Sequence, residues 1–468
     1  MKKKIMLLFL MVFTLFSASS CTGRITLLFL NWGEYIDESL LDAFEEQNNC
    51  NVLMDLGESN EIFYSKVFAG TTVYDVVCPS DYMVMKMYKK GLIEEIDFSR
   101  LNNYNPESED LRDGILSIRE DMIAGTDEKI ANYYIPYLWG TWGIMYSTKK
   151  EGLEDAVLNN ENQWASLFDR SALPSGINVA MYDSHQHAYY AACRYLGLPT
   201  HQELPQSDLD KIRKLVEKMN FNAWGTDNIK KQIVATNLDL GFMWTGDFLY
   251  YYAEQTAYRA MNALLDGKIS NDEIYPFLDA ITDTNVRTYK DLKDYEVGFD
   301  IFIPDDTIAF CDNLVVVKDK GRTSRKTDLI YKFIDFMCSQ EEKINNNIPD
   351  DSEEAEDNYV YPANANTQYV CYDTPFNSIY SEILALKDDE YTSESLSSES
   401  LDELKKTAKS SDAKTYNDSD PFWAAYNYAL SIAFYKYYPE NGKVGSILGS
   451  FDRKYINLIN NTFNNARA

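Results

Sequence analysis

The chain has 468 residues and a formal net charge of −29, with 44 lysines and arginines against 73 aspartates and glutamates. This excess of negative charge argues against nucleic acid and anionic lipid as partners, and it favours a cationic ligand. The length predicts two or three domain-sized units rather than one core.

Residues 1–20 are typical of an export signal. Three lysines at 2–4 precede an apolar stretch from Ile5 to Phe16 that is too short to span a bilayer, and small residues follow it. Small residues immediately before Cys21 resemble the lipobox of bacterial lipoproteins, which implies a lipid anchor on that sulfur as the only membrane attachment. Simple secretion with an incidental cysteine is the alternative. We therefore expect the protein in the periplasm or on the outer face of the cytoplasmic membrane.

Strand and helix patterns alternate over the first hundred residues after the predicted signal. The predicted strands cover 24–30, 50–56 and 74–80, and the predicted helices cover 36–47, 59–70 and 81–91. Such alternation builds a largely parallel sheet with helices on both faces. The expected fold class is therefore α/β.

Polar and aromatic residues follow these strands. In open α/β sheets, ligands bind beyond the carboxyl ends of the strands. Trp32, Glu34 and Tyr35 follow the first predicted strand, and Ser80 and Tyr82 follow the third. A single ring in such a place is more simply explained by packing under a loop, so the case for a site depends on further strand ends.

The aromatic and glycine-rich stretch 133–146 predicts a crossing into a second lobe. Three more strand-and-tip segments follow, at 176–197, 238–255 and 307–319. Their tips carry Asp183, Trp244, Asp247, Phe310 and Asp312. Carboxylates and rings that recur at equivalent strand ends indicate one binding site.

This set of residues suits a flexible alkyl chain with ammonium groups at intervals. Carboxylates would meet each ammonium through charge-assisted hydrogen bonds, and ring faces would line the methylene groups. Each ring also attracts an ammonium by about 0.5–2 kcal/mol. The residues therefore predict a polyamine ligand.

Sequence motifs add a family resemblance. The segments "NWGEY" at 31–35, "YDVVCPSDY" at 74–82, "WTGD" at 244–247 and "YVYP" at 359–362 occur in this order. With them the chain resembles the spermidine/putrescine-binding proteins of bacterial ABC importers over nearly its whole mature length. The resemblance implies a type II periplasmic-binding-protein-like fold, in which two α/β lobes joined by hinge crossovers close around a polyamine. It also implies a monomer that docks on permease subunits, has no cofactor or metal and is not an enzyme.

The same resemblance implies a role for individual residues. Asp183 matches the first acid of the family's D-x-x-E element, where this chain has Gln186 in place of the glutamate. Asp247 and Phe310 resemble the residues at the matching positions of the family's putrescine-preferring branch. Losing one carboxylate removes about 1.5–3 kcal/mol of charged hydrogen bonding, which Asp247 offsets, so we expect putrescine to bind at least as tightly as spermidine. The implied ligand-binding set is Trp32, Glu34, Tyr35, Ser80, Tyr82, Asp183, Gln186, Trp244, Asp247, Phe310, Asp312 and Tyr361.

The expected lobes are each built from two stretches of chain. Lobe I covers 22–137 and 309–370, and lobe II covers 138–308 and 371–468. Crossings between them are expected near 136–141, 305–310 and 368–376. Ligand would bridge the lobes and favour a closed form.

Other interpretations of the same residues remain open. The fold could hold another solute, such as ferric ion or an oligosaccharide, or two carboxylates could serve a secreted glycosidase. Trp244 and Phe310 could be core rings, and Asp247 a helix N-cap. His185 and His187 could bind a metal, although solvated side chains at a helix start are the simpler explanation.

The remaining features are scattered cysteines and two polar segments. Six cysteines after Cys21 show no paired spacing, so we expect buried thiols rather than a disulfide framework, although one bridge is possible. Residues 345–358 predict an acidic loop. Residues 387–421 have low complexity and predict a mobile or marginally helical surface insertion, in which the spacing of Leu396, Leu401 and Leu404 would support a short helix.

Overall fold

A computed structural model describes residues 23–467, apart from 227, 283–291, 351, 353–354, 356–357, 411–415, 417–418 and 439–444. The predicted export signal and Cys21 lie outside the described residues. The described strands form a nine-stranded sheet in the order β2-β1-β3-β9-β4-β7-β5-β6, with β8 added alongside β4, and a separate two-stranded sheet.

One end of the large sheet has the predicted strand–helix alternation. Its strands are β1 (Thr26–Asn31), β2 (Asn51–Leu56) and β3 (Val76–Val77), and β1 pairs in parallel with both of the others. The helices that follow them are α2 (Ser39–Asn48), α3 (Asn60–Ala69) and α4 (Asp81–Lys89). The Ser59 hydroxyl accepts a hydrogen bond from the Ile62 amide and so caps α3 as its sequence predicts. We call the part of the molecule around β1–β3 the first lobe.

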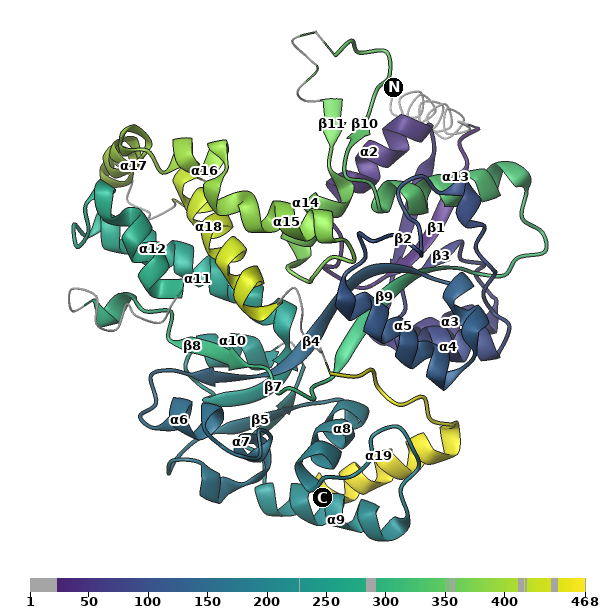
Figure 1. Cartoon of the computed structure of the whole chain (residues 1–468), viewed down its shortest axis with the longest axis horizontal. Helices are drawn as coiled ribbons and strands as arrows, with labels where there is room; N and C mark the ends of the chain where they lie inside the picture. The colour runs from purple at the N-terminus through teal and green to yellow at the C-terminus, as the bar shows by residue number, and fades with distance from the viewer. Residues whose placement is uncertain are drawn as a thin grey trace, which may run out of the picture.

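Two long strands connect this lobe to the rest of the sheet. The first half of β4 (Ile135–Ser147) pairs antiparallel with β9 (Ala309–Val316), up to Thr141. From Trp142 onward β4 pairs instead with β7 (Leu240–Trp244) and β8 (Phe299–Phe302). The chain therefore passes from one set of strands to the other within a single buried strand, as Figure 1 shows near its centre.

The second lobe surrounds the other end of the sheet. Here β5 (Val179–Tyr182) pairs in parallel with β6 (Ala223–Gly225) and β7. The C-terminal helix α19 packs against α8 and α9. Eight of the described helices belong to this lobe: α6 (Leu153–Leu158), α7 (Ala165–Phe168), α8 (His185–Leu196), α9 (Gln206–Met219), α10 (Asn228–Val234), α11 (Thr245–Leu265), α12 (Ile274–Thr282) and α19 (Arg453–Arg467).

Further helices cover both lobes. In the first lobe α5 and α13 flank the sheet, and near the second lobe α18 lies along α11 (Figure 1). The small sheet pairs β10 (Glu342–Lys343) with β11 (Tyr359–Val360) around the expected acidic loop. These helices are α5 (Asp113–Gly125), α13 (Ser324–Met337), α14 (Pro362–Val370), α15 (Asn377–Ala385), α16 (Glu390–Ser395), α17 (Ser398–Ser410) and α18 (Asp420–Tyr437).

The described part of the low-complexity segment 387–421 is largely helical. It contributes α16 and α17, and its leucines Leu396, Leu401 and Leu404 are 3%, 0% and 7% exposed. The expected short helix is therefore present in the described residues, and its leucine spacing reflects burial. Burial of the leucine stripe against the second lobe's helices supplies the stabilisation that composition alone does not reveal.

The six cysteines from Cys50 to Cys371 are buried and unpaired, which confirms the prediction of buried thiols. Among the residues that the structure describes, no helix has the length and apolarity needed to cross a membrane. The same residues contain no cluster of three or more histidine, cysteine or acidic side chains arranged to hold a metal ion.

Candidate functional site

The carboxylate of Asp312 lies at the centre of a cluster that joins three separate segments. Asp312 belongs to β9 and is 5% exposed. The Tyr35 hydroxyl donates a hydrogen bond of 2.8 Å to Oδ2, and the Ser80 hydroxyl donates one of 2.5 Å to Oδ1. The Asn60 side-chain amide in turn donates to the Ser80 oxygen at 2.9 Å. The structure thus brings three of the predicted site residues into direct contact.

Burial controls the charge of this carboxylate. Loss of hydration raises the pKa of Asp312 to about 6, and the hydrogen bonds from Ser80 and Tyr35 oppose that rise. In the described part of the chain, no lysine or arginine forms an ion pair with Asp312. A buried carboxylate whose only side-chain partners are hydroxyl groups favours a cation supplied from outside the chain.

A second buried acid, which sequence reasoning missed, lies beside the first. Asp81 is 1% exposed and accepts a hydrogen bond of 2.8 Å from the Cys311 amide. Burial, with the nearby Asp312 charge, raises the pKa of Asp81 to about 7. Tyr82 follows it in α4, and burial raises the pKa of that phenol well above its ordinary value. Asp81 was overlooked because an acid in the first turn of a helix has an ordinary structural explanation.

Aromatic rings run from the Asp312 cluster toward the second lobe. The centroid of Tyr35 lies 5.4 Å from that of Tyr372, Tyr372 lies 5.6 Å from Phe310, and Phe310 lies 4.4 Å from Trp244. Trp244 in turn lies 4.1 Å from Trp142 on β4. The rings of Tyr35, Tyr372, Phe310 and Trp244 are named here the aromatic row. Its members come from both lobes and from the segment that joins them.

Tyr372 is the member of the row that sequence reasoning missed. It lies in the expected crossing segment 368–376, where the Asp373 amide and carbonyl pair with Trp139 of β4. A tyrosine next to an acid inside a predicted hinge is the signal that would have found it. Ring contacts with Tyr35 and Phe310 place the crossing segment beside the Asp312 cluster.

Two of the three expected ligand carboxylates already have a cation from the chain. Asp183 pairs with Arg467 at 2.6 Å, and its side chain is 41% exposed. Asp247 pairs with Lys230 at 2.7 Å, with side chains 18% and 13% exposed. The structure therefore does not present Asp183, Asp247 and Asp312 as three equivalent anions. Asp247 is the third residue of α11, whose N-cap is Trp244, so the N-cap interpretation of Asp247 is wrong.

Three further predicted residues flank the first strand or begin α8. Trp32 packs on Phe63 at 4.4 Å, and its buried indole nitrogen has no hydrogen-bond acceptor among the described residues. Glu34 is exposed and has a left-handed φ of 53°. Burial raises the pKa of Tyr251, and the charge of Glu34 makes a smaller contribution to that rise. Gln186 is half-buried in the first turn of α8. None of the three has a side-chain hydrogen bond that links it to Asp312 in the described structure.

Tyr361 is not brought to the cluster. Tyr361 lies immediately before α14 and is 50% exposed. Partial burial raises the pKa of its phenol, and the charge of the neighbouring Glu341 adds to that rise. The structure therefore places this expected ligand residue on the surface rather than beside the aromatic row.

The two histidines of 185–187 have separate surroundings. His187 is buried against Trp142 at 4.2 Å and bonds with Ser184 at 2.7 Å, and burial lowers its pKa to about 3. His185 bonds with Asn460 at 3.0 Å. The expectation that both are solvated is therefore wrong for His187. A neutral His187 extends the aromatic surface behind Trp244, from which it lies 5.5 Å.

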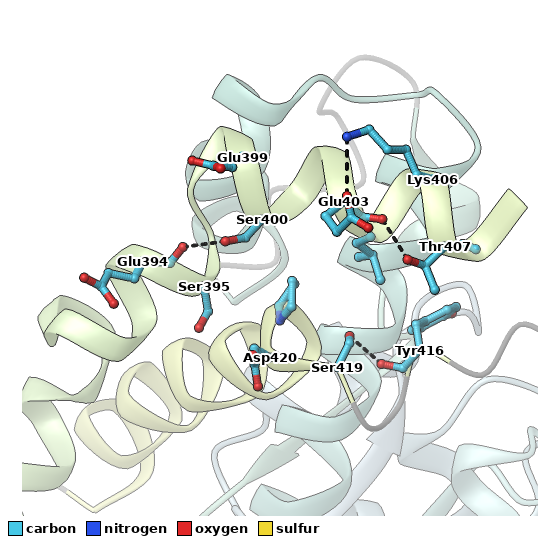
Figure 2. Close-up of a pocket in the computed structure, with 13 residues that line it drawn as sticks. Glu394, Ser395, Glu399, Ser400, Glu403, Lys406, Thr407, Tyr416, Ser419 and Asp420 are labelled. Atoms are coloured by element: carbon cyan, nitrogen blue, oxygen red, sulfur yellow. Dashed lines mark hydrogen bonds and ion pairs between the residues drawn. The ribbon is translucent and has the colours of Figure 1, made fainter. Parts of the chain in front are cut away.

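A cavity of about 710 Å³ lies elsewhere, among α16, α17 and the start of α18. Figure 2 shows acidic side chains around it, including Glu394, Glu399, Glu403 and Asp420, with Lys406 paired to Glu403. None of the predicted site residues lines this cavity. The candidate site is therefore the Asp312 cluster with the aromatic row.

Comparisons with known proteins agree with this fold. Residues 1–170 match a family model described as "Hypothetical lipoprotein (MG045 family)". The chain is 27% identical over 234 residues to the spermidine/putrescine-binding periplasmic protein of Salmonella typhimurium, a match that covers 49% of this chain and 61% of the relative. It is 26% identical over 334 residues to the putrescine/cadaverine-binding protein of Pseudomonas aeruginosa, covering 70% and 79%.

The fold is shared with a solved structure. The crystal structure of the spermidine/putrescine ABC transporter substrate-binding protein PotD from Streptococcus pneumoniae matches with a TM-score of 0.54 and 20% identity, over 95% of this chain and 99% of that one. This likeness confirms the α/β fold class. The relatives are substrate-binding proteins and not enzymes. In sequence the chain is therefore similar to spermidine/putrescine-binding and putrescine/cadaverine-binding proteins, and it shares the fold of a solved ABC-transporter substrate-binding protein.

Proposed function

We propose that the protein captures a small polyamine outside the cytoplasm and delivers it to the permease of an ABC importer. The observation that carries the proposal is the buried carboxylate of Asp312, held by the Tyr35 and Ser80 hydroxyls at the end of the aromatic row. An ammonium placed there would satisfy the carboxylate through a charge-assisted hydrogen bond. The names of the relatives support the same ligand class.

The ligand's alkyl chain would lie along the aromatic row. Each methylene removed from water contributes about 0.8 kcal/mol, and each ring facing an ammonium adds about 0.5–2 kcal/mol. Tyr35, Tyr372, Phe310 and Trp244 thus recognise a chain that is apolar along its length and cationic at its ends. Trp32, Glu34, Tyr82 and Gln186 would act as outer contacts of the closed form.

Export and anchoring complete the proposal. The match to a lipoprotein family over residues 1–170 supports a lipid anchor on Cys21 as the membrane attachment. A two-lobed protein tethered at its N-terminal end would present the closed, loaded form to permease subunits. The excess of acidic residues would draw a polycation toward the site at low ionic strength.

Calorimetric titration of the mature protein with putrescine, cadaverine, spermidine and spermine tests the proposal. We expect saturable binding, with putrescine at least as tight as spermidine, because one expected carboxylate is Gln186 and Asp183 is paired with Arg467. Spermidine binding more than tenfold tighter than putrescine would overturn the preference. Binding of ferric citrate or maltotriose, with no heat from any amine, would overturn the function.

A further inference from the structure

The ion pair between Lys230 and Asp247 differs from the surface pairs of this protein. It joins α10 to the first turn of α11, with Nζ 2.7 Å from Oδ1. Both side chains are largely buried, whereas Lys211 in its pair with Asp208 is 62% exposed. A pair shielded from solvent is less screened and is held more firmly than an exposed one.

The start of α11 lies directly against the aromatic row. A β-carbon on Gly246 would be 2.6 Å from the Tyr372 ring, so only glycine permits this approach of helix to ring. The negative charges of Asp247 and Asp312 both add to the effect of burial in raising the pKa of Tyr372. Tyr372 therefore lies within electrostatic reach of both carboxylates.

The two carboxylates have different partners. Asp312 receives hydrogen bonds from two neutral hydroxyls, whereas Asp247 faces the ammonium of Lys230. In the described structure Asp312, on β9, has no lysine or arginine as an ion-pair partner. Asp247, on α11, is paired with Lys230. A ligand ammonium that approached Asp247 would meet another ammonium of the same charge.

We infer that Lys230 is a specificity-determining residue: its ammonium occupies at Asp247 the place that the second ammonium of a diamine would take. Lys230 therefore lowers the affinity for diamines relative to amines that have one charged end. This inference rests on the proposed function, in which Asp312 anchors the first ammonium. The physical cause is competition between like charges for one carboxylate, together with repulsion between them.

The test compares putrescine with n-butylamine, which has a similar alkyl chain and one ammonium. Calorimetry is run on the unmodified mature protein, on Lys230→Met and on the matched control Lys211→Met, whose ion pair lies on the exposed face of α9. We expect Lys230→Met to bind putrescine about tenfold more tightly and n-butylamine within twofold of the original affinity. Lys211→Met should leave both affinities within twofold.

Two further variants show whether a change in affinity comes from misfolding and whether a gain in putrescine affinity depends on Asp247. Lys230→Gln keeps a hydrogen-bonding side chain and should gain about threefold for putrescine. The double variant Lys230→Met/Asp247→Asn should lose the gain made by Lys230→Met. The inference is overturned if both Lys230 variants leave putrescine binding unchanged or weaken it. If the unmodified protein binds neither amine, the proposed function itself has failed.

Discussion

The Tyr35 hydroxyl donates a hydrogen bond of 2.8 Å to Asp312, although the two residues are 277 positions apart. The bond connects the loop after β1 to the long strand β9, and the Tyr35 ring begins the aromatic row. Its effect is to orient one carboxylate oxygen while Ser80 orients the other. The fold therefore presents a fixed, buried acid next to apolar rings.

The first prediction is that Asp312→Asn abolishes most of the amine binding. The change removes the buried charge but keeps the size of the side chain. A hydrogen bond to a charged group is worth about 1.5–3 kcal/mol, which corresponds to roughly a tenfold to 150-fold loss of affinity. Calorimetric titration with putrescine measures this loss.

Asp183→Asn is the matched control for that change. Asp183 is also an acid at a strand tip, but it is exposed and paired with Arg467. We expect its affinity for putrescine to stay within threefold of the original. A larger loss in Asp183→Asn than in Asp312→Asn would show that the ligand binds on the α8 side and not at β9.

The second prediction concerns the pH dependence of binding. Burial raises the pKa of Asp312 to about 6, so the acid is increasingly protonated below that pH and cannot pair with an ammonium. Affinity for putrescine should rise about tenfold between pH 5 and pH 7 and then level off, since the ligand itself stays protonated to about pH 10. Titration in buffers of different ionisation heat should show proton release near pH 6. An unchanged affinity across this range would contradict the assignment of Asp312 as anchor.

Burial of Asp81 and Asp312 also makes the free energy of unfolding depend on pH. The pKa values of Asp81 and Asp312 rise to about 7 and about 6, above the value of about 3.8 for an unburied aspartate. Between these limits the folded state binds more protons than the unfolded state, so these acids lower the free energy of unfolding as pH rises. We expect the ligand-free protein to melt at a lower temperature at pH 7.5 than at pH 5.5. Asp81→Asn should reduce that difference.

The third prediction concerns the buried ion pair between Arg112 and Asp373. Their side chains are 1% and 0% exposed and lie 2.8 Å apart, and the guanidinium stacks on Tyr380 at 3.6 Å. Arg112→Met leaves a buried carboxylate without its partner, which costs about 3–5 kcal/mol. Urea unfolding followed by circular dichroism should show a correspondingly lower midpoint.

Arg213→Met serves as the comparison. Arg213 pairs with Glu217 one turn along α9, and the two side chains are 33% and 39% exposed. Exposed helical pairs contribute about 0.3–0.5 kcal/mol, so the midpoint should barely move. Equal effects of the two arginine changes would mean that the buried pair contributes no more than a surface one.

The fourth prediction is that putrescine closes the molecule. The two lobes are joined by β4, by β9 and by the segment around Asp373, and the aromatic row spans the junction. A ligand that contacts Tyr35 and Trp244 together has more contacts in a closed form and favours it. Small-angle X-ray scattering should give a smaller radius of gyration at saturating putrescine. Identical curves with and without ligand would contradict hinge closure.

Much of the first lobe could be predicted from the sequence because its signals are local. The strands β1 and β2 begin and end within two residues of the predicted runs, and Ser59 caps α3. The third strand pairs over fewer residues than the predicted run 74–80. Hydrogen bonds to β1 run from Asp75 to Cys78 and stop at Pro79, which has no amide hydrogen to donate.

The site could be predicted only in part because its neighbours come from distant segments. Tyr35 and Ser80 follow the parallel strands β1 and β3, whose carboxyl ends align, and this part of the site was predictable. Asp312, expected at a strand end, lies instead within β9, which runs antiparallel to β3 and so brings the carboxylate to the same place from the opposite direction. The partner of Asp183 is Arg467, 284 positions away in the C-terminal helix, and no local pattern in the sequence predicts this pairing. The same holds for Lys230, whose pairing depends on how α10 packs against α11.

The rates at which the six buried thiols react with a reagent would report local opening of the structure around each of them. Each is buried, and burial raises the pKa of Cys50, Cys78, Cys193, Cys311, Cys338 and Cys371, so each reacts slowly until its surroundings open. Cys78 lies next to the Asp312 cluster, Cys193 lies in α8, and Cys371 precedes the ring of Tyr372. The order in which a maleimide reagent modifies them would therefore report which lobe opens first and how a bound amine slows the opening of each.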